Sequence, residues 1–110
     1  MHLYTHQEEL NECEDLKKEF LTLLWERDHI KSRLSNRVRP LPLELRTKVD
    51  EDFSKINGLL SICDDKFIKM RDSDFWETEI LTVDLHFFLE KIKSYVEEIK
   101  KTSGIRITPY

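Results

Sequence analysis

The stretch from Phe75 to Ile99 carries two apolar stripes at helical spacing, and it restricts the possible folds more than any other part of the chain. One stripe advances by steps of four and three residues: Leu81, Leu85, Phe88, Ile92, Tyr95 and Ile99. A second stripe lies on a neighbouring face and contains Trp76, Ile80, Val83 and Phe87, while Leu89 and Val96 widen the apolar surface further. A helix that is apolar around so much of its circumference must be covered on more than one side. The sequence therefore predicts a central helix with the rest of the chain packed around it.

Two earlier segments also show helical periodicity. A helix predicted over residues 5–36 begins with a capping box formed by Thr5 and Glu8. Its apolar stripe consists of Cys13, Leu16, Phe20, Leu23, Ile30 and Leu34. A helix predicted over residues 42–71 opens at Pro42, whose fixed φ suits a first helical turn. Its stripe is regular throughout: Val49, Phe53, Ile56, Leu60, Cys63, Phe67 and Met70.

The third predicted helix covers residues 74–103, with Asp74 and Glu77 as a start signal and Gly104 as a left-handed cap. The apolar register survives the gap between the second and third helices, so one continuous rod is the alternative. A chain of 110 residues with only 2 Gly and 3 Pro favours long helices joined by short turns. We predict an all-α, antiparallel up-down-up three-helix bundle over residues 1–104, followed by a C-terminal tail over 105–110.

Two local features leave alternatives open. The tail alternates apolar and polar residues, and it either docks on the bundle, stays loose or adds a strand to the sheet edge of another protein. Cys13 and Cys63 are predicted at a similar height on adjacent helices. Buried reduced thiols are the favoured interpretation, and a disulfide requires the two Cα atoms to lie within about 7 Å of each other.

No apolar run reaches the ~20 residues that a membrane-spanning helix needs. The first ten residues also lack the basic and apolar regions of a signal peptide. We therefore expect a cytoplasmic protein without a membrane span.

The net charge of −4 is unevenly distributed along the chain. Residues 1–15 contain five acids and no Lys or Arg, and residues 49–90 contain eleven acids and four bases. Residues 27–48 contain seven bases and two acids, and residues 91–110 contain five bases and two acids. In an up-down-up bundle, residues 27–48 and 91–106 form a basic pole, and the acidic segments meet at the other end. Such a pole is either ordinary solvated surface or a site for acidic partners, phosphates or an anionic surface, and head-to-tail association of the two oppositely charged ends is a third possibility.

The chain offers no coherent set of catalytic residues. Glu26 and His29 have the i, i+3 spacing of di-iron bundles, but the pair occurs once, and surface charge is the favoured interpretation. His86 is predicted to be an edge histidine with a hydrogen-bond partner. No Gly-rich loop is present, and no serine has a histidine at a persuasive spacing. We expect no enzymatic activity, no cofactor and no bound metal.

The leading hypothesis is a non-enzymatic helical-bundle interaction module: an adaptor, a complex subunit or a small inhibitor or regulator. The expected partner is a protein, which includes a second copy of the chain. The alternative is a nucleic-acid or phosphate-binding module that uses the basic pole. Candidate interaction residues are Trp25, Lys31, Arg33, Arg37, Arg39, Arg46 and Lys48.

The two tryptophans have separate predictions. For Trp25, core and interface positions both remain open, because it lies on a flank of the first helix's stripe. Trp76 is predicted to cap the core near Leu3 and Tyr4. No motif in the sequence identifies a family.

Overall fold

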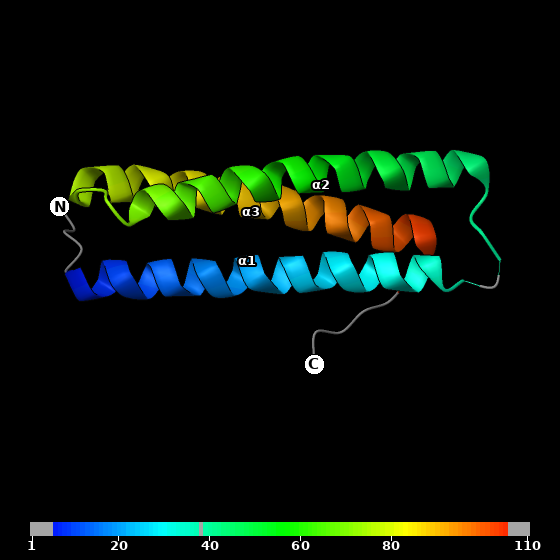
Figure 1. Ribbon diagram of the computed structural model, residues 1–110, viewed down its shortest axis with the longest axis horizontal. Coiled ribbons are helices and arrows are strands. Elements are labelled where there is room, and N and C mark those ends of the chain that lie inside the picture. Colours follow the sequence, from blue (N-terminus) through cyan, green and yellow to red (C-terminus); the bar gives the residue numbers. More distant parts are fainter. Residues whose placement is uncertain (1–5, 38, 106–110) are drawn as a thin grey trace.

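The structure is a computed structural model that describes residues 6–37 and 39–105, with the backbone alone described for residues 6–11 and 75. This part of the chain forms three helices: α1 (His6–Ser35), α2 (Leu43–Met70) and α3 (Phe75–Ser103). They run side by side along a body whose Cα extents are 54 × 26 × 24 Å (Figure 1). Each helix bound lies within one residue of the predicted ranges 5–36, 42–71 and 74–103. The predicted all-α three-helix bundle is confirmed.

Local sequence signals set the described helix ends. The Asp74 carboxylate accepts a hydrogen bond of 2.8 Å from the Glu77 backbone N–H, and Gly104 ends α3 with a φ of 70°. Pro42 is the residue that precedes α2, and its carbonyl accepts from the Arg46 N–H at 2.9 Å. The predicted capping box at Thr5 and Glu8 lies outside the residues whose side chains are described. Because α2 ends at Met70 and α3 starts afresh at Phe75, the continuous rod is wrong.

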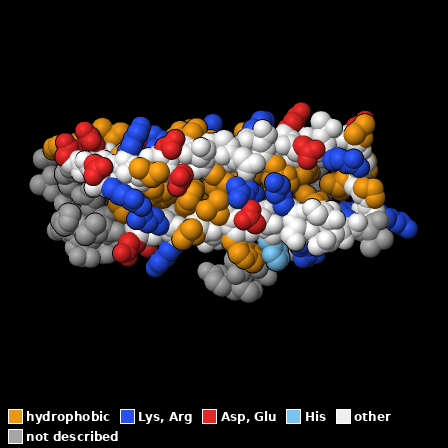
Figure 2. All heavy atoms as spheres, viewed as in Figure 1, with side chains coloured by type: hydrophobic (Ala, Val, Ile, Leu, Met, Phe, Trp, Pro, Cys, Tyr) orange, Lys and Arg blue, Asp and Glu red, His pale blue; other side chains and the backbone are white. Residues whose placement is uncertain are grey.

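The core forms where α1 and α2 both pack on α3, while α1 and α2 contact each other little. The inner side of α3 contributes side chains that are at most 1% exposed: Leu85, Leu89, Ile92, Val96 and Ile99. The regular stripe of α2 is buried from Val49 to Phe67, as predicted. In the space-filling view, apolar side chains remain visible in a band between α1 and α2, with charged side chains along its borders (Figure 2).

A ladder of paired polar side chains at seven-residue intervals joins α1 to α3, and the two rungs that contain Lys are ion pairs. Its rungs are Glu12 with His86 (3.1 Å), Glu19 with Lys93, and Glu26 with Lys100 (3.0 Å). α1 and α3 run in the same direction, and a heptad step returns to the same helix face. An acidic edge of α1 therefore lies along a basic edge of α3.

The opposite edge of α3 is acidic where it meets α2. Lys66 pairs with Asp84 at 3.3 Å, and Lys48 pairs with Glu98 at 3.0 Å. α3 thus presents bases to the acidic edge of α1 and acids to the basic edge of α2. This charge pattern assigns each neighbouring helix to its own side of α3.

The two cysteines lie at different heights, so the predicted similar height is wrong. The Cys13 sulfur is 4.0 Å from the sulfur of Met70, and Cys63 lies two helical turns, or about 10 Å, from Met70 along α2. This separation exceeds the Cα distance that a disulfide can bridge. Cys63 is fully buried, and that burial raises the pKa of its thiol to about 11.

The first residue of the predicted tail belongs to the core. Ile105 is only 7% exposed and packs against the buried cluster of the bundle. Residues 106–110 lie outside the described part of the chain.

Candidate interaction surface

The outer face of α3 exposes four large apolar side chains in a row. The exposed fractions are 67% for Trp76, 63% for Ile80, 64% for Val83 and 56% for Phe87. We call these four residues the outer stripe. They form the second stripe predicted from the sequence. The prediction that the rest of the chain covers this side of the helix is wrong, and its coverage by a second copy or another partner stays a prediction.

The outer stripe follows from the helical period of α3. Val83 lies nine residues before the buried Ile92, which places it half a turn around the helix axis from the core. Steps of four, three and four residues keep the stripe parallel to the axis over about 16 Å. Because α1 and α2 both occupy the inner side, neither reaches this face.

Trp76 does not cap the core in the predicted way, because two-thirds of its side chain is exposed. Its predicted neighbours Leu3 and Tyr4 lie outside the described residues. Trp76 therefore forms the amino-terminal end of the outer stripe.

Carboxylates border the outer stripe on both sides. Glu77 and Asp84 lie on the edge towards α2, and Glu79 and Glu90 lie on the other edge. We call these four residues the acidic margin. Four carboxylates therefore flank the stripe, against one base of α3, Lys91, that lies beside Phe87.

Half of the acidic margin has a cationic partner within the bundle. Asp84 pairs with Lys66 at 3.3 Å, and Glu90 contacts Lys93 at 3.4 Å. Within the described residues, the carboxylates of Glu77 and Glu79 form no ion pair. The ammonium of Lys91, a base next to the stripe, lies 5.0 Å from the centroid of the Phe87 ring.

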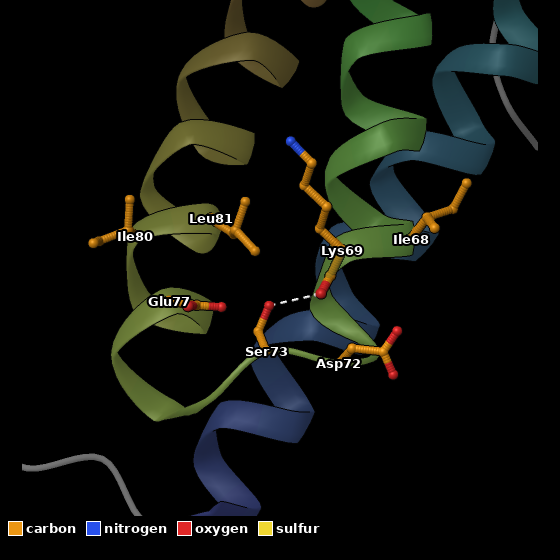
Figure 3. A pocket seen from close by; sticks show the side chains of 7 residues that line it. All are labelled: Ile68, Lys69, Asp72, Ser73, Glu77, Ile80 and Leu81. Atoms are coloured by element: carbon orange, nitrogen blue, oxygen red, sulfur yellow. Dashed lines mark hydrogen bonds between the residues drawn. The ribbon is translucent and has the colours of Figure 1, made fainter.

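An open hollow of about 500 Å³ adjoins the outer stripe where α2 ends and α3 begins. It is lined by Ile68, Lys69, Asp72, Ser73, Glu77, Ile80 and Leu81 (Figure 3). Leu81 and Lys69 face the space between the helices, whereas Ile80 points outward from α3 (Figure 3). The Ser73 hydroxyl donates a 2.6 Å hydrogen bond to the Lys69 carbonyl at the base of the hollow. Ile80 joins this hollow to the outer stripe.

Trp25 lies on the outer face of α1, where it is 42% exposed. Its ring stacks on the ring of His29, with centroids 4.7 Å apart and planes inclined by 16°. Leu21, one turn earlier, is 61% exposed. The core position left open for Trp25 is therefore wrong, and its place in an interface stays a prediction.

The basic pole predicted from the topology does assemble. Arg37, just after α1, donates a 2.8 Å hydrogen bond to the carbonyl of Ser103 at the end of α3. A second donor of Arg37 bonds the Arg39 carbonyl at 3.1 Å. Arg37 therefore caps the carboxyl end of α3, where a positive charge complements the helix dipole.

Most other cations of the basic pole also interact within the bundle. Arg46 donates to the Leu41 carbonyl at 3.4 Å, Lys48 pairs with Glu98, and the Lys31 ammonium lies 5.9 Å from the ring centroid of Phe53. Arg33 and Arg39 have exposed side chains. The pole is thus partly neutralised by the fold.

The histidines and acids considered for metal binding are dispersed. Glu26 is buried against Lys100, and His29 stacks on Trp25. The ring of His86 contacts Glu12 at 3.1 Å, so it is a partnered edge histidine as predicted. Among the side chains that the structure describes, no three His, Cys, Asp or Glu residues are grouped so that they could hold a metal ion.

Asp52 is an acid on α2 that the core encloses. Its side chain is 3% exposed, and its Oδ2 atom has no hydrogen-bond partner among the described residues. Burial, and next the negative charge of Glu98, raise the pKa of the Asp52 carboxyl above its ordinary value of 3.8. The buried charge opposes folding at neutral pH.

We expect Asp52→Asn to raise the free energy of unfolding at pH 7 by about 1 kcal/mol, because the amide carries no charge into the core. Well below pH 3.8 the wild-type carboxyl is protonated in both states, so the gain is smallest there. As the pH rises through the raised folded pKa, the wild type loses stability relative to the variant. Urea titrations across this pH range measure the difference, and a gain that stays constant with pH would contradict the expectation.

Comparisons with protein-family models, with curated proteins and with solved structures find no match to this chain. Over the described residues, none of the helices combines the length and apolar character needed to cross a membrane. The candidate interaction surface is therefore identified from the geometry of this chain alone.

The sequence contained a signal for the outer stripe. Three helices with one apolar stripe each can close a core, and the chain has four stripes because α3 has two. No helix of the bundle remains to pack on the fourth stripe. Counting stripes against helices shows that one stripe is left over, but not which of the two stripes on α3 it is.

Proposed function

We propose that this chain is a non-enzymatic interaction module that binds a protein partner through the outer face of α3. The observation that supports this proposal is the outer stripe, in which four large apolar side chains are each more than half exposed. Aromatic and aliphatic side chains aligned on one rigid helix are typical anchors of protein interfaces. The roles of adaptor, complex subunit and inhibitor all remain compatible with this proposal.

The size of the outer stripe supports a reversible interface. From the exposed fractions, its side chains expose roughly 500 Å² of apolar surface, within the range of monomer patches that are often functional. A partner that buries an equal area brings the total to about 1,000 Å², just below the standard range of about 1,200–2,000 Å². We therefore expect a partner that binds reversibly. Its contacts with the acidic margin or with the hollow would add to the buried area.

The basic pole remains the second candidate, as a site for nucleic acid or phosphate. Arg33 and Arg39 are exposed there and support it. Three observations weigh against it: Arg37 caps α3, Lys48 pairs with Glu98, and the chain as a whole is acidic.

The test compares variants in cells that make the chain naturally. A photo-cross-linking residue at Val83 should join the chain to a partner. The double variant Ile80→Ser with Phe87→Ser should reduce recovery of that partner at least about tenfold. The helical circular dichroism should stay unchanged, because both side chains are exposed. A cross-linker at Leu21 and the variant Leu21→Ser are the matched controls on α1.

Equal recovery of the partner with the stripe variant and with Leu21→Ser would overturn the proposal. The double variant Arg33→Glu with Arg39→Glu tests the second candidate, and it spares Arg37 because that residue caps α3. Binding of DNA or RNA at low salt that this variant abolishes, and that falls steeply as salt rises, would favour the basic pole instead.

A further inference from the structure

The charge around the outer stripe restricts what can cover it. All four residues of the acidic margin are carboxylates, and two of them, Glu77 and Glu79, form no ion pair within the described residues. Asp72 and Asp74 extend the negative charge around the hollow and the start of α3. An occupant that carried acids in the matching positions would meet repulsion from both edges.

The shape of the stripe fits another helix. Steps of four, three and four residues are the spacing of one side of a helix–helix seam. A straight stripe of about 16 Å matches three turns of a partner helix. The hollow beside Ile80 provides room for one further side chain at the amino-terminal end of the seam.

Charge separates the two simplest helical occupants. Antiparallel pairing of two copies through α3 would match an aromatic end with an aromatic end, but it would also bring two acidic margins together. A basic helix would instead neutralise the margin. The same margin disfavours an anionic membrane surface, because helices that bind such surfaces carry Lys and Arg beside their apolar face.

We infer that the outer stripe and its acidic margin form a docking site for an amphipathic partner helix with Lys or Arg on both flanks of its apolar face. This inference rests on the proposed function and names its partner class. The apolar stripe supplies most of the affinity, and the margin selects a basic helix over an acidic one.

Three synthetic peptides test the inference on the full chain. The first has apolar residues at four-three-four spacing with Lys on both flanks, the second has Glu in place of Lys, and the third contains the residues of the first in scrambled order. By fluorescence anisotropy of labelled peptides at low salt, we expect the first to bind at least about tenfold tighter than the second. The scrambled peptide should not bind. At about 1 M salt, where the Debye length is about 3 Å, the difference between the first two should largely vanish.

Variants connect the preference to this surface. Glu79→Lys with Glu90→Lys should remove the preference for the basic peptide, and Phe87→Ser should weaken binding of that peptide. Asp50→Lys with Glu51→Lys changes the net charge equally on exposed positions of α2 and should leave the preference unchanged.

Equal affinity for the basic and acidic peptides, or binding of the scrambled peptide, would overturn the inference. A dimer seen by light scattering that Phe87→Ser abolishes would also overturn it, because the occupant would then be a second copy. That result would leave the proposed function intact, since the stripe would still be a protein interface. The proposed function fails on a separate result: the double variant Ile80→Ser with Phe87→Ser still recovers the partner that was cross-linked in cells.

Discussion

Ile92→Ala is expected to lower the free energy of unfolding by about 3 kcal/mol. Ile92 is 0% exposed at the centre of α3, between the layers contributed by α1 and α2. Truncation removes buried methylene groups and leaves a cavity that three long, rigid helices cannot close. For a domain of this size, such a loss is a large share of the total stability.

Val83→Ala is the matched control, because it removes apolar atoms from the same helix on the opposite face. Val83 is 64% exposed, so its loss should change the free energy of unfolding by less than about 0.5 kcal/mol. Urea unfolding followed by circular dichroism measures both variants. Similar losses in the two would mean that the outer stripe is buried in solution, and a second copy would then be the first explanation to examine.

The helices and their bounds could be predicted because the signals are local. The Asp74 cap, the Gly104 end and the proline-containing loop before α2 each act through a few neighbouring residues. The apolar period of α2 from Val49 to Phe67 then identifies its buried face without a gap. Short loops between long helices leave the up-down-up arrangement as the simplest topology.

The fate of the second stripe on α3 could not be predicted in the same way. Periodicity shows that Ile80, Val83 and Phe87 share a face, but not whether another helix reaches that face. Coverage depends on where α1 and α2 pack, and both bury their apolar stripes against the inner side of α3, with ion pairs along its two edges. The relative heights of Cys13 and Cys63 could not be predicted either. Periodicity within one helix does not show how far that helix is shifted along its neighbour, and this shift sets the height of each residue.

The basic pole shows what charge counting omits. The topology correctly predicted that the ends of α1 and α3 meet, as the contact between Arg37 and Ser103 shows. Counting could not show that Arg37 caps a helix end or that Lys48 pairs with Glu98. Cations near helix carboxyl termini are partly neutralised by the fold, so their number overstates the field available to a ligand.

The ion-pair ladder between α1 and α3 has one rung that is largely excluded from water. The side chains of Glu26 and Lys100 are 12% and 15% exposed and lie 3.0 Å apart. Burial alone would lower the pKa of Lys100, but hydrogen bonds to Glu26 and Glu97 outweigh it and raise the pKa. Lys100 thus stays charged at neutral pH, and either partner left alone would be an incompletely compensated charge in a poorly solvated site.

Glu26→Gln and Lys100→Met are each expected to lower the free energy of unfolding by about 2 kcal/mol. The double variant should lose about 1–2 kcal/mol less than the sum of the two, because it leaves no unpaired charge in the buried site, and the other partner of Lys100, Glu97, is 64% exposed to solvent. Urea unfolding of the wild type, both single variants and the double variant at neutral pH completes the cycle. Glu12→Gln, in the more exposed rung with His86, should cost less than about 0.5 kcal/mol. Strict additivity at Glu26 and Lys100 would show that water screens this rung as well, and the ladder would then align α1 with α3 without stabilising their contact.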